Sequence, residues 1–334
     1  MKVGVIGAGT WGTALAQVLC DNNHNVFLLS TKEHQVNEIN SLHKNSKYFG
    51  NEIFINEKIV ATLSYETCAQ DSDYIVLAVP TIAIRDVIHN LLPYIKKPTV
   101  FINAAKGFDV LTNKRLSEVI KELIPHDLLR GFASIIGPGH AEEVIIRKLT
   151  MITSTSLDIN IAKEVQLLFS NNYLRVYTNT DEIGAELGVA IKNVIAIASG
   201  ILEGLDYGDN TRAALVTRGL HEIVRFGLFF GGKMETFMGL AGIGDLMVTC
   251  NSRHSRNYRA GVIIGKDDSS ELFLKYNEET TEGVRTTRVV YELAKKHNIY
   301  MPIVTGMYKI LYENAKPSDM IKDIINLPLK SEKE

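Results

Sequence analysis

Cysteine is scarce in this sequence, and the three that occur, Cys20, Cys68 and Cys250, lie far apart. Their odd number and the lack of a C-x-x-C pair exclude a disulfide framework and a thiolate metal cage. The nine histidines form no HExxH motif or other close pair of ligands, so no metal site is predicted. This use of cysteine favours a reducing, cytoplasmic location.

Long runs of basic or apolar residues are also lacking. The formal net charge is −2, which argues against a nucleic-acid partner. No apolar segment reaches the roughly 18 residues of a membrane span without a charge or a helix-breaking glycine. Residues 1–19 superficially resemble a secretory signal, but Gly7, Gly9 and Gly12 interrupt the apolar stretch. We therefore expect a compact protein without stable membrane insertion, and 334 residues suffice for two domains.

Short apolar segments alternate with amphipathic segments in the first half of the chain. The strand-like segments are 2–7, 25–30, 74–79, 99–104 and 133–137, and helical patterns occupy 11–22, 82–92 and 113–124. Because strands separated by helices form parallel sheets, this half predicts a Rossmann-type, doubly wound α/β fold. Two further strand-like segments, 149–154 and 174–178, are expected to extend the sheet.

From about residue 181 the strand-like segments disappear and the sequence becomes helical. The clearest helical segments are 183–204, 211–230, 234–239, 256–265 and 283–297. We therefore divide the chain into an α/β domain, 1–180, and an all-α domain, 181–334. The charged end of the chain, 330–334, is expected to be frayed and solvated.

A glycine-rich segment, GVIGAGTWG, connects the first predicted strand to the first predicted helix. Gly7, Gly9 and Gly12 follow the pattern G-x-G-x-x-G. The first glycine permits a tight turn, the second lets the backbone approach a pyrophosphate, and the third allows close packing of a helix whose N-terminus faces the anion. A purely structural turn is the alternative, but the strand-turn-helix context predicts a dinucleotide site.

The end of the second strand is where a dinucleotide-binding fold carries its ribose-binding acid, about 20 residues after the glycines. That place reads Leu29-Ser30-Thr31-Lys32, without Asp or Glu. Lys32 and the nearby His34 would not repel a 2′-phosphate. The sequence therefore allows NAD, NADP or both.

Two loops follow predicted strands at the edge where a doubly wound sheet binds its ligand. The segment 103–108, NAAKGF, places Lys106 there, although an exposed loop lysine without function is an equally good alternative. In GPGHAEE, Gly137 and Gly139 give the backbone freedom before a helix that is expected to start at Ala141. Such a turn can offer N–H groups to an anion.

Lys192 is charged in an otherwise apolar helical segment, ELGVAIKNVIAIASGI. Apolar residues lie all round the helical projection, so the helix is expected to be buried. An unpaired ammonium is costly to bury, so a partner must meet it or its pKa must fall. A lysine that reaches the surface or pairs with a carboxylate is one reading, and a catalytic lysine is the other.

Three polar clusters stand out in the helical half, at 239–246, 251–261 and 280–287. Asp245 lies in a glycine-rich turn, where a helix cap or turn residue is the alternative to a site residue. Arg253, Arg256 and Arg259 are interspersed with Ser and Asn, a combination that suits a phosphate site, although a solvated basic face is the alternative. Glu282 is expected to cap a helix near Gly283.

Taken in order, these motifs resemble those of the bacterial-type NAD(P)-dependent glycerol-3-phosphate dehydrogenase family: GAGTWG (7–12), AAKGF (104–108), IGPGHAEE (136–143), ELGVAIKNVIAIASGI (186–201), GLAGIGDLMVTC (239–250), SRHSRNYRAG (252–261) and TEGVRT (281–286). The resemblance spans nearly the whole chain. It implies a first domain that binds NAD or NADP and a helical, substrate-binding domain similar to the C-terminal domain of 6-phosphogluconate dehydrogenase. The implied reaction interconverts glycerol 3-phosphate and dihydroxyacetone phosphate for glycerophospholipid synthesis, and the implied assembly is a homodimer.

The resemblance also implies roles for individual residues. Lys192 matches the catalytic acid/base. The substrate-binding positions are Lys106, Gly137, Gly139, Lys192, Asp245, Ser255, Arg256 and Asn257, and the cofactor-binding positions are Gly7, Gly9, Thr10, Trp11, Gly12, Lys32, Lys106, Ala141, Arg256 and Glu282. Gly139 departs from the family, which usually has Ser or Thr there, so a backbone N–H, His140 or water must replace that hydroxyl. A phosphogluconate or hydroxyacid dehydrogenase and a dinucleotide sensor without turnover are the alternatives.

Overall fold

A computed structural model describes residues 1–277, 281–325 and 331 of the chain. The chain forms two compact units: unit 1 comprises Met1–Val189 and Phe230–Asp245, and unit 2 comprises Ala190–Phe229 and Leu246–Glu334. Unit 1 therefore extends beyond residue 180 and also includes a later segment. The division at 180 stays a prediction about the functional halves of the chain. The end predicted to be frayed, 330–334, lies outside the described residues apart from Ser331.

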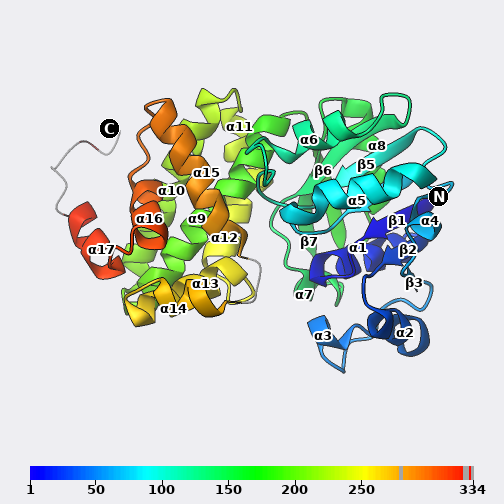
Figure 1. Ribbon diagram of the computed structural model, residues 1–334, viewed down its shortest axis with the longest axis horizontal. Coiled ribbons are helices and arrows are strands. Elements are labelled where there is room, and N and C mark those ends of the chain that lie inside the picture. The colour runs from blue at the N-terminus through cyan, green and yellow to red at the C-terminus, as the bar shows by residue number, and fades with distance from the viewer. Residues whose placement is uncertain (278–280, 326–330, 332–334) are drawn as a thin grey trace. The chain divides into compact units, whose positions relative to one another are not determined.

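Unit 1 is built on one eight-stranded sheet, visible in Figure 1, with the order β3-β2-β1-β4-β5-β6-β7-β8. Its strands are β1 (Lys2–Ile6), β2 (Asn25–Leu29), β3 (Val60–Thr62), β4 (Tyr74–Leu77), β5 (Thr99–Asn103), β6 (Leu129–Ile136), β7 (Thr150–Thr155) and β8 (Leu174–Asn179). Strands β1 to β6 are all parallel, as the sequence predicts for a doubly wound fold.

The strand order reverses at β1, since the chain builds β2 and β3 on one side of it and then crosses to β4 on the other. Ile6 pairs with both Leu29 and Leu77, so the carboxyl ends of these three strands are level. Doubly wound sheets bind their ligands at such a switch point. Gly7, the first residue after β1, therefore lies where a ligand is expected.

The pairing of β6 with β7 differs from the predicted all-parallel sheet, because these two strands are antiparallel. The connection between them contains only α7 (Ala141–Val144), a four-residue helix. A parallel neighbour is usually joined through a longer crossover helix, whereas the chain here reverses direction. Strand β8 then pairs parallel with β7.

Helices cover both faces of the sheet in unit 1. One apolar core joins the sheet to α1 (Thr10–Asp21) and α8 (Ile159–Phe169), and a second joins it to α4 (Tyr65–Ala69), α5 (Ile84–Leu91) and α6 (Leu116–Leu123). The remaining helices are α2 (Glu33–Leu42), α3 (Ser46–Phe49), α11 (Met234–Phe237), the short 3₁₀ helices η1 (Thr81–Ala83) and η2 (Leu92–Tyr94), and the π-helix η3 (Leu240–Gly244). The sequence did not predict β3, α2, α3 or α4, which are short or largely polar.

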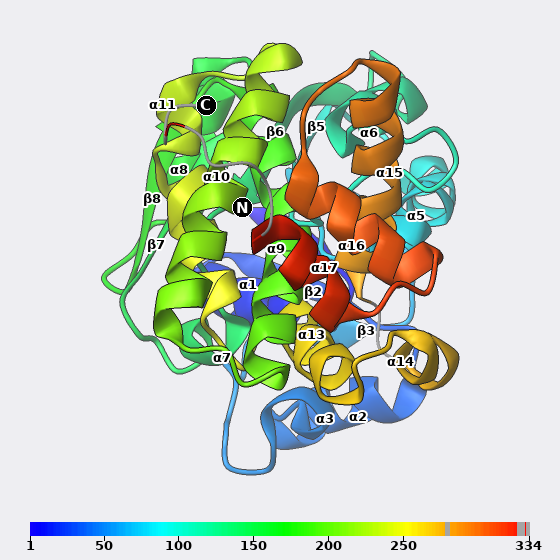
Figure 2. The same cartoon turned by 90° about the vertical axis from the view of Figure 1, so that its left-hand side faces the viewer.

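Unit 2 is helical in the part of the chain that the structure describes, and Figure 2 shows its helices around α9 (Glu182–Gly204). The others are α10 (Asp209–Phe229), α12 (Asp245–Cys250), α13 (Arg256–Asp267), α14 (Glu271–Tyr276), α15 (Glu282–Lys296), α16 (Pro302–Tyr312) and α17 (Pro317–Ile325). A Cβ at Gly200 would lie 2.1 Å from the Tyr258 carbonyl oxygen, so the glycine lets α9 and α13 approach closely.

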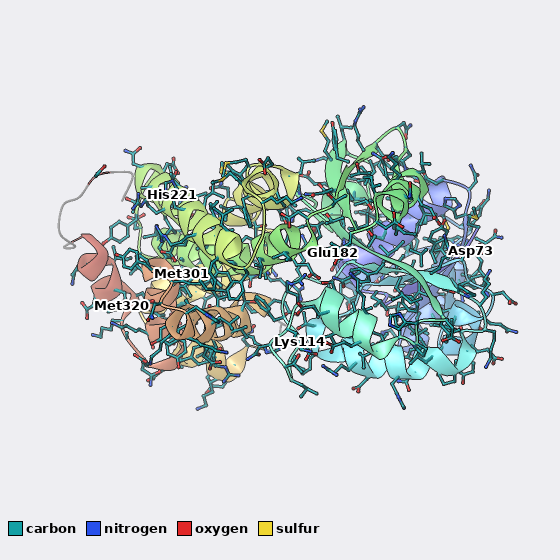
Figure 3. All side chains as sticks on the ribbon, turned by 90° about the horizontal axis from the view of Figure 1, so that it is seen from above. Asp73, Lys114, Glu182, His221, Met301 and Met320 are labelled. Atoms are coloured by element: carbon teal, nitrogen blue, oxygen red, sulfur yellow. The ribbon has the colours of Figure 1, made fainter. Side chains whose placement is uncertain are left out.

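Helix α9 is the one described helix that is long and apolar enough to cross a membrane by length and composition. Its most apolar stretch is completely buried within the protein, as the sequence pattern predicts for a core helix. Its first turns are fixed within unit 1 by carboxylates that pair with α6. Glu182, labelled in Figure 3, accepts hydrogen bonds from the Lys121 Nζ, and Glu186 accepts from Arg115 and Ser117.

Candidate active site

The glycine-rich turn has the shape that a bound pyrophosphate requires. Gly7 has φ +110°, a conformation that L side chains rarely adopt, and a Cβ at Gly12 would lie 1.9 Å from the Gly7 carbonyl oxygen. A Cβ at Gly9, by contrast, would meet no protein atom within 4 Å. The fold therefore requires Gly7 and Gly12, whereas Gly9 keeps open a space beside the N-terminus of α1, where an anion binds favourably. These residues fit a dinucleotide.

Trp11 and Gly139 lie against each other in unit 1. A Cβ at Gly139 would lie 3.1 Å from Cη2 of the Trp11 ring, which is closer than most real Cβ contacts. A serine or threonine at position 139 would therefore have to displace the ring. The indole Nε1 is buried and has no hydrogen-bond partner among the described residues. The Trp11 ring thus takes part of the space that a side chain at 139 would need.

The end of β2 carries a buried hydroxyl where other dinucleotide-binding folds carry an acid. Ser30 is buried and accepts a hydrogen bond from the backbone N–H of Lys32. Lys32 itself is exposed at the N-cap of α2, and Glu33 follows in the first turn. Lys32 is thus accessible at the end of β2.

Lys106 lies in the loop after β5 and pairs with a carboxylate. Its Nζ is 3.2 Å from Oδ2 of Asp245, which is only 1% exposed. Gly107, the next residue, has φ +142°, so the loop turns sharply just after the lysine. The pair brings together two predicted site residues that are far apart in the sequence, both within unit 1.

Asp109 fixes the loop that carries Lys106. It is fully buried and accepts two hydrogen bonds from the Arg85 guanidinium, at 2.8 and 2.9 Å. It also accepts hydrogen bonds from the backbone N–H and the hydroxyl of Thr112. Burial alone would raise the pKa of Asp109, but the hydrogen bonds from Arg85 and Thr112 hold it well below its usual range. The loop is therefore anchored on a permanently charged carboxylate.

The turn after β6 contains Gly137, Gly139 and Ala141 as predicted. Gly137 has φ +142°, and a Cβ there would lie 3.0 Å from the Ile152 Cα in β7. Helix α7 begins at Ala141 but ends after one turn. A helix this short contributes little macrodipole, so an anion here would rely on individual N–H groups of the turn.

Lys192 lies in the buried part of α9, with a relative exposure of 3%. Its Nζ donates a hydrogen bond of 2.7 Å to Oγ1 of Thr249 in α12. The ammonium does not reach bulk solvent, so the reading of Lys192 as a surface lysine is wrong. The hydroxyl of Thr249 is one of the polar groups that make its burial tolerable.

The predicted phosphate segment forms the start of α13. Ser255 is the N-cap residue, and its Oγ accepts a hydrogen bond from the Tyr258 N–H at 3.2 Å. Arg256 is exposed in the first turn, and the Asn257 Oδ1 accepts from the Gly283 N–H at 2.9 Å. Helix α15 begins at Glu282, one residue before the predicted start, with Thr281 rather than Glu282 at the N-cap position.

Beside α13 lies a groove of about 900 Å³ within unit 2. Its cationic lining residues are Arg253, Arg256, Arg259 and Lys266, and its apolar lining includes Ile263, Leu272 and Phe273. The three arginines of the sequence motif therefore share one concave surface. Among the described residues, no three His, Cys, Asp or Glu side chains gather in a way that could hold a metal ion.

Sequence reasoning missed Thr249, Asn193 and the polar side chains behind the glycine-rich turn. Thr249 lies four residues after Asp245, one helical turn away, and that spacing is the only signal the sequence offers. Asn193 follows Lys192 and is also buried, and a Cβ at Gly283 would lie 2.7 Å from its carbonyl oxygen. Only the folded chain shows that Thr249 contacts Lys192 and that polar side chains contact the glycine-rich turn.

Two family descriptions together match almost the whole chain. The NAD-dependent glycerol-3-phosphate dehydrogenase N-terminus matches residues 2–162, and the C-terminus of the same family matches residues 181–322. A glycerol-3-phosphate dehydrogenase (NAD(P)+) from Bacillus cereus (strain AH187) is 46% identical over 333 residues, covering 100% of this chain and 98% of the relative.

Solved structures show the same similarity. The glycerol-3-phosphate dehydrogenase of Coxiella burnetii is 34% identical, with a TM-score of 0.89 over 97% of this chain and 98% of that one. The Plasmodium falciparum glycerol-3-phosphate dehydrogenase has a TM-score of 0.87 over 99% of this chain and 97% of its own, at 23% identity, and so supports the fold alone.

Proposed function

Because the chain belongs to the NAD-dependent glycerol-3-phosphate dehydrogenase family, we propose that Lys192 is the acid/base of the reaction that this chain catalyses. The chain interconverts sn-glycerol 3-phosphate and dihydroxyacetone phosphate and uses NAD or NADP. The predicted family, fold class and class of cofactor are thus confirmed. The observation that carries the proposal for Lys192 is its burial on α9 with Nζ 2.7 Å from Thr249.

The proposed role of Lys192 follows from where charge develops. When bound, the nicotinamide supplies a hydride to the carbonyl carbon or takes one from the carbinol carbon. In the direction of reduction, negative charge grows on the former carbonyl oxygen, and a fixed ammonium there stabilises it. A lysine in a site with little water can give that oxygen a proton and take it back in the reverse direction.

Each lysine of the proposed site has a polar partner within its own unit. Lys106 pairs with Asp245, the first residue of α12, and Lys192 bonds to Thr249, the fifth. We propose that both lysines serve one substrate, with Asp245 orienting Lys106 and Thr249 orienting Lys192.

Ser255, Arg256 and Asn257 are proposed to bind the substrate phosphate. The exposed Arg256 guanidinium lies in the first turn of α13, where backbone N–H groups also favour an anion. Gly137 and Gly139 are proposed to add backbone contacts. Binding energy from the phosphate, which takes no part in the chemistry, then serves to orient the reacting carbon.

The proposed cofactor contacts are Gly7, Gly9, Thr10, Trp11, Gly12, Lys32, Lys106, Ala141, Arg256 and Glu282. The open space at Gly9 and the accessible Lys32 support them. Lys32 suits the 2′-phosphate of NADP, and the lack of an acid at the end of β2 removes the usual discrimination against it. Use of both NAD and NADP is therefore proposed.

We propose a cytoplasmic location, supported by the scarcity of cysteine, since the chain has only three cysteines and all three are buried. The same proposal includes a role in supplying glycerophospholipid synthesis. It includes neither a nucleic-acid partner nor stable membrane insertion.

A homodimer is also proposed. Met151 and Tyr177, which are 39% and 42% exposed, line a hollow of about 360 Å³ on unit 1, and such apolar surface suits a protein contact. Light scattering after gel filtration tests it, since Tyr177→Glu should then yield monomers.

The test of the function is an assay of the purified protein with dihydroxyacetone phosphate. Oxidation of NADH and of NADPH is followed by the absorbance of the reduced nicotinamide, and 2-keto acids serve as comparison substrates. We expect turnover with dihydroxyacetone phosphate and none with the keto acids. Turnover with keto acids alone would favour a hydroxyacid dehydrogenase, and folded protein that binds NADH without turnover would favour a sensor.

A further inference from the structure

A buried polar network lies behind the glycine-rich turn. The side-chain amides of Gln35, in α2, and Asn45, just before α3, both donate a hydrogen bond to the carbonyl oxygen of Ala8, at 2.7 and 3.1 Å. Ala8 is the middle residue of Gly7-Ala8-Gly9. Two donors from outside the turn therefore hold one carbonyl oxygen of the loop that faces the dinucleotide.

The network is closed, and its members are buried. The Gln35 amide also donates a hydrogen bond to the Asn45 Oδ1 at 2.9 Å. The Asn45 amide nitrogen donates a second hydrogen bond, to Oγ1 of Thr13 in α1, at 2.9 Å. Ser30, at the end of β2, donates to the Gln35 Oε1. Both amides therefore have one consistent orientation, with the nitrogen atoms toward Ala8. The network thus joins the turn to the strand end where the ribose is expected.

The peptide between Ala8 and Gly9 connects the held carbonyl oxygen to the N–H of Gly9. Among the described residues there is no cis peptide bond, and in a trans peptide the C=O and the next N–H point in opposite directions. Holding the Ala8 oxygen toward Gln35 and Asn45 aims the Gly9 N–H the opposite way. The place where a Gly9 side chain would lie is open space. A peptide flip would replace that donor with an oxygen and repel a pyrophosphate.

We propose that Gln35 and Asn45 are positioning residues that lock the Ala8–Gly9 peptide so that its N–H is preorganised for the pyrophosphate of the dinucleotide. A turn fixed before binding loses less entropy on binding than a mobile one. Two polar amides are also a costly choice for filling a buried space that apolar side chains would fill more cheaply. The proposal rests on the dinucleotide site of the proposed function.

The test compares dinucleotide binding by full-length variants. Gln35→Met keeps the length of the side chain but removes one donor to Ala8, and Asn45→Asp keeps the shape but removes the other. Asn40→Asp is the matched control, because the Asn40 side chain also forms hydrogen bonds to a backbone, that of Ala61, without contacting Ala8. Dissociation constants for NADH and ADP-ribose are measured by calorimetry and by the fluorescence of Trp11, the only tryptophan. Thermal unfolding and steady-state kinetics accompany them.

We expect Gln35→Met and Asn45→Asp to raise both dissociation constants about tenfold or more, with kcat at saturating NADH within about twofold of the parent. Asn40→Asp should bind normally even if it melts earlier. If Asn45→Asp does not fold, Gln35→Met decides alone. The inference is overturned if folded Gln35→Met binds both ligands as the parent does, or if Asn40→Asp weakens binding equally. Failure of the parent itself to bind NADH would instead refute the dinucleotide site.

Discussion

The hydrogen bond between Lys192 and Thr249 gives the sharpest test of the proposed chemistry. Thr249→Val keeps the shape of the side chain and removes the hydroxyl that accepts from the Lys192 Nζ at 2.7 Å. A hydrogen bond to a charged group is worth about 1.5–3 kcal/mol, and each 1.4 kcal/mol changes a rate about tenfold. If that bond holds the ammonium in its reactive position, kcat should fall about 10- to 100-fold.

Lys192→Met should cause the larger loss of kcat, because it removes the lysine itself. It removes both the proton donor, worth about 10²- to 10⁴-fold, and the positive charge at the developing oxyanion. We expect kcat to fall at least about 10³-fold while the dissociation constant for NADH stays nearly unchanged. In the Lys192→Met background, Thr249→Val should lower kcat no further, because its effect acts through the lysine.

Ser199→Ala is the matched control for these two variants. Ser199 also lies on α9 and bonds to α12, donating to the Cys250 carbonyl oxygen at 2.9 Å, so its loss disturbs the same helix pair. Its kcat should stay within about twofold of the parent. The reasoning is refuted if Thr249→Val lowers kcat equally in both backgrounds, or if Lys192→Met keeps most of its turnover. Stopped-flow and steady-state measurements with saturating dihydroxyacetone phosphate supply the rates.

Three further predictions follow from single residues. Gly9→Ala should melt at the temperature of the parent yet fail to bind NADH by calorimetry, because its Cβ would lie in the open space at Gly9. Gly12→Ala should melt at a much lower temperature, since its Cβ would lie 1.9 Å from the Gly7 carbonyl oxygen. Equal melting temperatures for the two variants would contradict this packing. The Glu222 carboxylate accepts hydrogen bonds from the Ile303 and Val304 N–H groups at the start of α16, just after Met301, which Figure 3 labels. Burial raises the pKa of Glu222 to about 7 from an ordinary 4.5. The folded state thus holds the proton more tightly. The free energy of unfolding by urea should therefore fall, relative to Glu222→Gln, by up to about 3 kcal/mol as the pH rises from 4.5 to 7; a constant difference would rule this out. Arg256→Ala should raise the KM for dihydroxyacetone phosphate about tenfold or more, while Lys266→Ala, in the same groove, should not, and an unchanged KM removes Arg256 from the phosphate site.

Short-range patterns in the sequence were enough for the fold class and for the turn that binds the dinucleotide. Short apolar segments and the glycines at positions 7, 9 and 12 are local signals, because strand formation and backbone freedom depend on neighbouring residues. The strand β7 was predicted, but its antiparallel pairing with β6 was not. Its direction depends on the length of the connection and on which edge of the sheet is open, and apolar periodicity carries neither piece of information.

The sequence by itself determined that Lys192 lies in a helix with apolar residues on every side, because helical periodicity is fixed by the chain. Only the tertiary structure decided that Thr249 meets its ammonium, that Asp245 meets Lys106, and that Gln35 and Asn45 hold Ala8. Each of these pairs is separated by many residues along the chain. Which side chains meet across such distances depends on how whole elements pack, and one sequence without its fold does not contain that answer in any local pattern.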